Sequence, residues 1–293
     1  MLRYFTLVSL LALCRGFESI TTFPEGSVEP LPLKTNDAPK SRIVGGQTTT
    51  IANYPWAVSL QHEWEEYTYD TIHFCTGTII NKDWILATGV CALMIESENV
   101  TIRVGSDYFH EGGTVHEIEY AIFHPEFNET TQDYDLALLR LNTSLTLSNS
   151  VQAVKLPSLN QNYPEGTIFS MASWGASVFL GDMTTQLQYI SLPTITTELC
   201  QTVYFDRITD RMFCSYEEYV GMCIGDTGAA AVVDGVLIGI ASWDYACSSY
   251  GYPGVYANVS VMVDWITEVS SSSSPAPLFC LVAGLAILLR SEA

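Results

Sequence analysis

The stretch CTGTIINKDWILATGVC, residues 75–91, holds two short apolar runs on either side of the polar turn Asn81–Asp83. The runs are Gly77–Ile80 and Trp84–Thr88, and β-branched and aromatic residues between turn signals are typical of β-strands. The same rhythm returns elsewhere, at Trp56–Leu60, Val100–Val104, Leu136–Leu141, Gly235–Trp243 and Gly254–Val259. It predicts an all-β barrel or sandwich rather than βαβ units.

Only two stretches indicate helix. They are Thr197–Phe205 and Val261–Val269, and the second has apolar residues at helical spacing near the end of the domain. The chain has 293 residues, of which 48% are apolar and 12% aromatic, as in folded globular proteins. A chain of this length buries enough surface to need no structural metal, and we expect neither a metal nor a cofactor.

The two ends of the chain differ from its middle. Residues 1–16 contain Arg3 and the apolar run Phe5–Leu13, as in a secretory signal peptide, and residues 17–42 are predicted to be an exposed propeptide. Residues 43–269 form the predicted domain, and 270–293 a Ser-rich spacer and a hydrophobic tail. The tail's 12 apolar residues, Leu278–Leu289, are too few to span a bilayer as a helix. Two interpretations stay open, a glycosylphosphatidylinositol attachment signal that tethers the protein to a membrane, or an apolar tail without a role.

The predicted domain is strongly acidic. Between Ile43 and Val269 it has six basic and 27 acidic residues, and the whole chain has a net charge of −20. Such a surface repels phosphate backbones and anionic headgroups, so nucleic acid is excluded as a partner. A basic partner or simple solubility remain as explanations.

Eight cysteines are present, and six of them lie in the domain. If the protein is secreted and extracellular, these six are disulfide candidates, but spacing alone leaves about 15 pairings open. Four N-x-S/T sequences fit an extracellular surface as glycosylation sites, at Asn99, Asn128, Asn142 and Asn258.

Several stretches resemble the chymotrypsin/trypsin family of serine proteases, in that family's order. They include Arg42 followed by IVGG, the CTGTII…WILATGVC stretch, DLALLRL from Asp135, CIGDTG from Cys223, SW at Ser242, PGVY from Pro253 and VDWI from Val263. The resemblance covers Ile43–Val269 and implies a trypsin-like double antiparallel β-barrel with a C-terminal helix. It also implies the pairs Cys75–Cys91, Cys200–Cys214 and Cys223–Cys247. A further family bridge would fall at Phe169 and Val233, and both are apolar here.

The resemblance assigns the catalytic triad to three positions, only one of which is unchanged. The acid is Asp135, the histidine position is Val90, and the serine position is Thr227. Valine has no lone pair to accept a proton, and a hydroxyl without an adjacent base is a poor nucleophile. None of the other histidines is expected to stand in, since each is interpreted as a surface or structural residue, His73 included.

Other parts of the family's machinery are retained. Cleavage after Arg42 by a trypsin-like protease would create an ammonium at Ile43, which Asp226 is placed to receive. That ion pair would order the amides of Gly225 and Thr227 into the shape that holds an oxyanion. We therefore expect the cleavage switch to work still.

The specificity pocket is implied to be changed. Its positions are Gly221, Ser242, Trp243, Asp244 and Gly254, with glycine where trypsins have an aspartate. Asp244 replaces a usual glycine and is expected to obstruct the entrance, although drift after loss of catalysis explains the change equally well. The acidic, tyrosine-containing loop at residues 63–70 is either a docking surface for a basic ligand or merely solvated.

Three functions follow from these observations. We favour a catalytically inactive homologue that binds a protein partner, namely a protease, a protease inhibitor or a basic ligand. The alternatives are a weak hydrolase that uses Thr227 with another base, and a surface-tethered structural glycoprotein.

Overall fold

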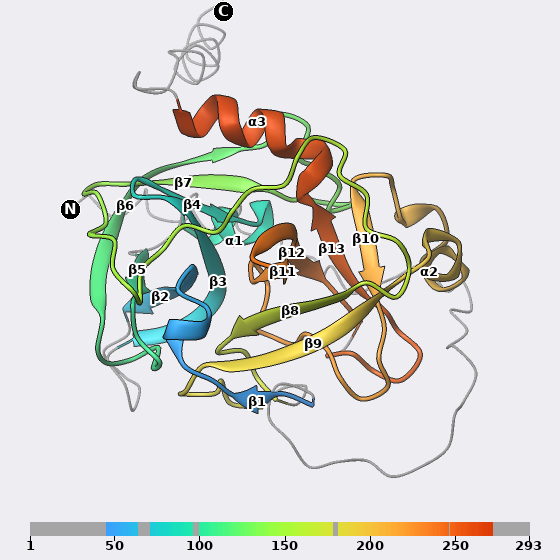
Figure 1. Ribbon diagram of the computed structural model, residues 1–293, viewed down its shortest axis with the longest axis horizontal. Coiled ribbons are helices and arrows are strands. Elements are labelled where there is room, and N and C mark those ends of the chain that lie inside the picture. The colour runs from blue at the N-terminus through green and yellow to red at the C-terminus, as the bar shows by residue number, and fades with distance from the viewer. Residues whose placement is uncertain (1–44, 64–70, 96–99, 178–180, 246, 272–293) are drawn as a thin grey trace, which may run out of the picture.

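Six antiparallel strands form the first of two barrels in the computed structural model, which describes residues 45–63, 71–95, 100–177, 181–245 and 247–271 (Figure 1). The ring closes in the order β2-β3-β4-β7-β6-β5. In the strand at residues 100–104, apolar and polar side chains alternate, and so does their burial. The three valine and isoleucine side chains point into the barrel and are buried, whereas Thr101 and Arg103 between them are only partly buried. The strands are β2 (Ala57–Glu63), β3 (Thr71–Asn81), β4 (Trp84–Ala87), β5 (Val100–Val104), β6 (Thr114–Phe123) and β7 (Ala137–Leu141).

The second barrel is also closed, because β8 pairs with β9 at the end of the order β9-β10-β13-β12-β11-β8. The short strand β1 (Gln47–Thr48) adds to the outer edge of β9. Phe169, Met171 and Tyr256 fill this barrel and are almost fully buried. The strands are β8 (Ile168–Ser173), β9 (Gln188–Ile195), β10 (Met212–Ser215), β11 (Ala230–Val233), β12 (Val236–Trp243) and β13 (Gly254–Asn258).

Three α-helices and two 3-10 turns complete the described chain. Helix α1 (Gly89–Ile95) begins beside Thr88, whose Oγ1 accepts a hydrogen bond from the Cys91 amide at 3.1 Å. Helix α2 (Thr197–Tyr204) has Thr196 as its N-cap, which accepts from the Leu199 amide. The 3-10 turns are η1 (Ile51–Asn53) and η2 (Phe205–Arg207).

Helix α3 (Val259–Ser271) lies where the two barrels meet (Figure 1). One apolar cluster joins side chains of both barrels to this helix. Its buried members include Leu86 and Leu138 of the first barrel, Ile240 and Ala257 of the second, and Met262 and Ile266 of α3. Burial of this helix therefore fixes one barrel against the other, and the site lies between them.

The predicted fold is confirmed: both barrels are antiparallel and the C-terminal helix is present. The predicted strands and both predicted helices lie within two residues of the observed bounds, except that β2 and β3 are longer than predicted. Helix α1 was not predicted, because seven residues are too few to display helical periodicity. No helix among the described residues is long and apolar enough to cross a membrane.

Candidate active site

The turn at residues 223–229 presents Thr227 between the barrels. Gly228 has a φ of 93° and packs so closely that a Cβ would lie 1.8 Å from the Thr76 carbonyl oxygen. The Thr76 amide donates to the Thr227 carbonyl oxygen at 2.8 Å, which ties the turn to strand β3 of the first barrel. The predicted nucleophile position is therefore held by both barrels.

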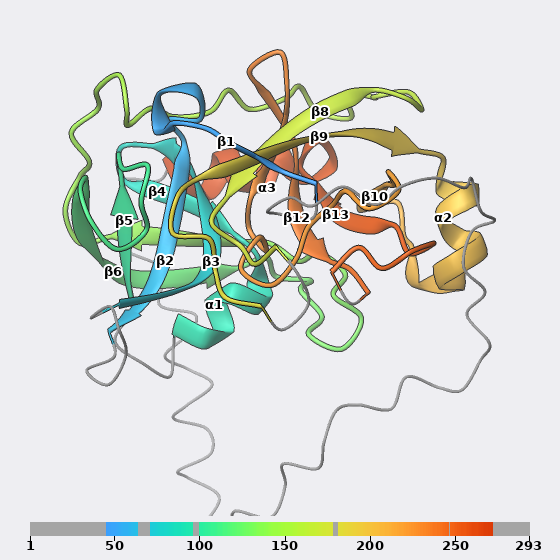
Figure 2. The ribbon, with the colours of Figure 1, turned by 90° about the horizontal axis from the view of Figure 1, so that it is seen from below.

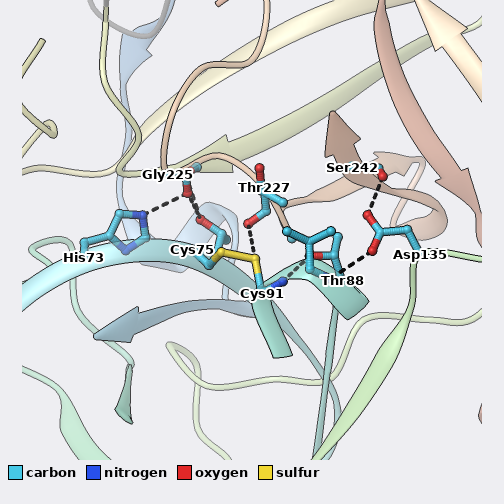
Figure 3. Close-up of a disulfide and its surroundings, with 12 residues drawn as sticks. His73, Cys75, Thr88, Cys91, Asp135, Gly225, Thr227 and Ser242 are labelled. Carbon is cyan, nitrogen blue, oxygen red and sulfur yellow. Dashed lines mark hydrogen bonds between the residues drawn. A yellow bond between two sulfur atoms is a disulfide. The ribbon is translucent and has the colours of Figure 1, made fainter. Parts of the chain in front are cut away.

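Asp135 is buried at the start of the β7 segment, with 1% of its surface exposed. Its Oδ1 accepts a hydrogen bond from the Val90 amide at 3.0 Å, and its Oδ2 accepts one from the Ser242 hydroxyl at 2.5 Å. Burial raises the pKa of this carboxyl to about 6, although both hydrogen bonds act in the opposite direction. Figure 3 shows Asp135 with Ser242 on one side of Thr227, and Gly225 with His73 on the other.

Val90 is the second residue of α1 and meets Asp135 through its backbone amide alone. An isopropyl side chain supplies neither a donor for Asp135 nor an acceptor for Thr227. The structure thus brings the three predicted triad positions, Asp135, Val90 and Thr227, close together. Ser242, which the resemblance assigned to the pocket, bonds to Asp135 beside them.

All five histidines of the chain lie in the described residues, and their rings contact other groups. His73 bonds to the Ser59 hydroxyl and the Gly225 carbonyl oxygen, and His116 to the Thr114 and Thr143 hydroxyls. The remaining three stack on or lie near aromatic rings: His62 on Phe74, His110 beside Phe109, and His124 on Tyr134.

His73 is the histidine closest to the site, and it is fully buried. Its Nε2 is 3.0 Å from the Gly225 carbonyl oxygen, and its Nδ1 is 2.8 Å from the Ser59 Oγ. A carbonyl only accepts, so Nε2 carries the proton and Nδ1 accepts from Ser59. Burial lowers the pKa of the imidazole to about 4, so the ring is neutral at physiological pH. From the sequence His73 was interpreted as a surface or structural histidine, and its direct hydrogen bond to the nucleophile turn was not predicted.

Asp226 is also fully buried, next to Thr227. Its Oδ2 accepts from the Cys223 amide at 2.7 Å, whereas its Oδ1 has no hydrogen-bond partner among the described residues. Burial raises the pKa of this carboxyl to about 7, and the nearby Asp244 acts in the same direction. An orphaned carboxylate oxygen in the interior is costly unless a cation meets it.

The pocket beside the turn is filled by the protein's own side chains. The Ser248 hydroxyl donates to the Met222 carbonyl oxygen at 3.0 Å and lies 1.9 Å from where a Gly221 Cβ would be. The Met222 methyl lies 3.1 Å from the Cβ position of Gly254, and Met222 is 1% exposed. Both glycines therefore face side chains of this chain, and we refer to this group of residues as the closed pocket.

Asp244 was expected to obstruct the entrance, and its carboxylate accepts a hydrogen bond from the Ser248 amide of its own loop. Because the Ser248 hydroxyl donates to Met222, this bond links Asp244 to the side chains beside the turn. Obstruction of the entrance by Asp244 stays a prediction. Burial raises the pKa of Asp244 to about 6.

Trp243, which directly precedes Asp244, is covered by neighbouring side chains. It is 9% exposed, the Arg207 guanidinium carbon lies 4.4 Å from its ring centroid, and the Tyr204 ring packs edge-on at 4.8 Å. The indole face is thus occupied by a cation from η2. Neither Ser248 nor Arg207 was identified from the sequence as part of the site.

The three disulfides that the resemblance implied are present, as Cys75–Cys91, Cys200–Cys214 and Cys223–Cys247. Phe169 and Val233, which replace a further bridge, pack in one apolar cluster. Asn128 and Asn142 are exposed and Asn258 is partly buried, and glycosylation of all three stays a prediction.

The other predicted features lie outside the described residues. These are residues 1–16, the propeptide 17–42, the junction at Arg42 and Ile43, Asn99, most of the 63–70 loop and the tail from 272 onward.

The comparisons with known proteins agree with this geometry. The family model described as Trypsin matches residues 43–266. Trypsin of Phaedon cochleariae is 38% identical over 242 residues, which cover 80% of this chain and 90% of that protein. Trypsin 5G1 of Aedes aegypti is 35% identical, over 78% and 85% of the two chains, and trypsin alpha of Drosophila melanogaster is 32% identical, over 86% and 93%. By its fold, its site and these matches, this chain belongs to the trypsin family.

Proposed function

We propose that this protein is a non-catalytic member of the trypsin family that acts outside the cell by binding another protein. The observation that supports this most directly is the surroundings of Asp135, whose two oxygens accept from a backbone amide and a serine instead of a histidine. In the mechanism of this family a histidine removes the proton of the attacking hydroxyl. Val90 cannot do so, and each of the five histidines has its ring elsewhere.

The loss of the base alone suffices to suppress turnover. In another serine protease, removal of either the nucleophile or the base lowers kcat by about 10⁶-fold, nearly as much as removal of the whole triad. Thr227 adds a methyl group to a turn that is already packed against Thr76. Substitution of both positions is therefore expected to lower kcat little more than substitution of one of them.

The filled pocket narrows the choice of partner. A protease inhibitor that inserts a side chain beside the nucleophile turn would meet Met222 and Ser248 there. Around the closed pocket, Tyr219, Ile224 and Tyr245 are each about 40% exposed. Exposed aromatic and apolar side chains of this kind are typical of interface centres. On a domain with 27 acidic residues, they favour a basic protein as the partner.

An active protease is the second candidate, because the relatives named above are all trypsins. The two functions are distinguished by reaction with an organophosphonate that modifies activated serine and threonine hydroxyls. The sample is the full chain after cleavage at Arg42, and the positive control is the double variant Val90→His with Thr227→Ser, which restores the base and the nucleophile.

We expect no adduct on Thr227 in the wild-type protein and a detectable adduct on the restored serine, both read by mass spectrometry. An adduct on wild-type Thr227 that is lost in the Thr227→Ala variant would overturn the proposal in favour of an active hydrolase.

A further inference from the structure

A cavity of about 530 Å³ lies on the outside of the second barrel, away from the nucleophile turn. It is bordered by β1 and η1 on one side, and by β8, β9 and the turn between β11 and β12 on the other. Figure 2 shows β1 beside β9 and apart from α1, and no residue of α1 or of the turn at residues 223–229 lines the cavity. Its lining includes no residue of the closed pocket.

Three aromatic residues line the cavity and hold one another in place. The rings of Tyr54 and Tyr189 are stacked with centroids 6.0 Å apart, and Trp56 meets Tyr54 edge-on at 6.0 Å. Tyr54 is 9% exposed, so it anchors the group, while Tyr189 and Trp56 are only partly buried. Rings fixed before a ligand arrives lose little conformational entropy when it binds.

Amide side chains next to these rings provide complementary hydrogen-bonding atoms. The Tyr189 hydroxyl donates to Gln47 Oε1 at 3.2 Å, which leaves the amide nitrogen of Gln47 to donate to a ligand. Asn53 uses its Nδ2 to donate to the Thr49 hydroxyl at 3.2 Å, which leaves its Oδ1 to accept. Both side chains are exposed at the cavity.

The charge of the lining restricts the chemistry of the ligand. Among the described residues that line the cavity, Asp234 is the only charged one, so they provide no cation for a phosphate or a carboxylate. Threonines 48, 49 and 50 make the wall too polar for a purely apolar ligand. A neutral molecule with many hydroxyl groups and one flat C–H face satisfies both the rings and the polar wall.

We propose that this cavity is a saccharide-binding site, in which the apolar face of a sugar ring lies on Tyr189 and Trp56 while its hydroxyls bond to Gln47, Asn53 and Asp234. The proposal is independent of whether Thr227 is catalytic. The same chemistry is available from a free oligosaccharide and from a glycan on another protein.

The test titrates the full chain, after enzymatic removal of its own N-glycans, with triacetylchitotriose, with mannotriose, and with a glycoprotein that carries high-mannose glycans. The same glycoprotein after deglycosylation is the control ligand. The variants are Tyr189→Ala and Asn53→Ala, and the matched control is Tyr120→Ala, a tyrosine on β6 of the first barrel that is partly buried like Tyr189.

We expect binding of at least one probe, weakened at least about tenfold (about 1.4 kcal/mol) in both cavity variants and unchanged in Tyr120→Ala. Binding of the glycoprotein alone identifies a protein-linked glycan as the ligand, whereas binding of a free trisaccharide identifies the oligosaccharide itself. If Tyr189→Ala does not fold, the affinity of Asn53→Ala for the probes alone tests the proposal. Failure of the wild-type protein to bind any probe, or equal affinity in all variants, would overturn the proposal.

Discussion

Substitution of Asp226 by Asn in the uncut chain should stabilise the protein, and more so at high pH. The folded-state pKa of Asp226 is raised from 3.8 to about 7 by burial, so its ionised form destabilises the fold. Below the unfolded-state pKa the carboxyl is protonated in both states and does not lower the stability of the fold. As the pH rises through about 7, that stability is lost because the buried carboxyl must ionise. A shift of about 3 units corresponds to about 4 kcal/mol at about pH 8, and to less than half of that at about pH 5. Asn keeps an oxygen for the Cys223 amide but carries no charge.

The assay is urea unfolding of chains that contain Arg42→Gln, which prevents cleavage by a trypsin-like protease. We expect Asp226→Asn to raise the free energy of unfolding by about 2–3 kcal/mol more at about pH 8 than at about pH 5. The same substitution at the exposed Asp206 is the control.

In the chain cleaved after Arg42, Asp226→Asn should lower the free energy of unfolding instead of raising it. An ammonium at Ile43 would then meet the orphaned Oδ1 of Asp226. A destabilised uncut Asp226→Asn variant at about pH 8, or an equal effect at both pH values, would refute this reasoning.

Two further predictions concern the closed pocket and the surface of the second barrel. The double variant Asp244→Gly with Ser248→Gly should open the pocket and bind indole, detected by chemical-shift changes. Glycine at position 248 should cause no backbone strain that lowers the melting temperature, because Ser248 has a φ of 53°, which suits glycine. Absence of indole binding would contradict a pocket closed by these two side chains. Arg211→Lys should lower the free energy of unfolding by about 1 kcal/mol, because lysine cannot reproduce the two-point contact with Asp133 or the stacking on Tyr134. An unchanged denaturant midpoint would show that this partly exposed pair contributes nothing.

The fold was predictable because its local signals agree with one another. Strands such as Val100–Val104 alternate in burial as their residues alternate in polarity, and turns of polar residues separate them. The resemblance carried by the ordered motifs then implied two barrels and the three disulfides, which the strand pattern and the cysteine spacing had left open. Helix α1 was missed because it is held by Thr88 and a disulfide rather than by a long amphipathic pattern.

The site was predictable only in part, because its closure depends on contacts between residues far apart in the sequence. Position relative to Cys223 was enough to find Thr227 and Asp226. The contact of Ser248 with Met222 depends on how the 244–248 loop folds back, and the cover of Arg207 over Trp243 depends on where η2 lies. Neither contact leaves a periodic or local signal. Asp244 was singled out from the sequence, but the hydrogen bond of its carboxylate with the Ser248 amide was not predictable.

The packing of Phe169 and Val233 affects how the protein responds to its redox environment. The three disulfides join residues only 14 to 24 positions apart, and each is expected to contribute about 3 kcal/mol by restricting the unfolded chain. The connection across the second barrel, between residues that are 64 positions apart, consists instead of buried apolar contacts. A reductant can therefore break the three disulfides, but among the described residues no disulfide joins β8 to β11, where the packing of Phe169 and Val233 takes the place of a covalent bond.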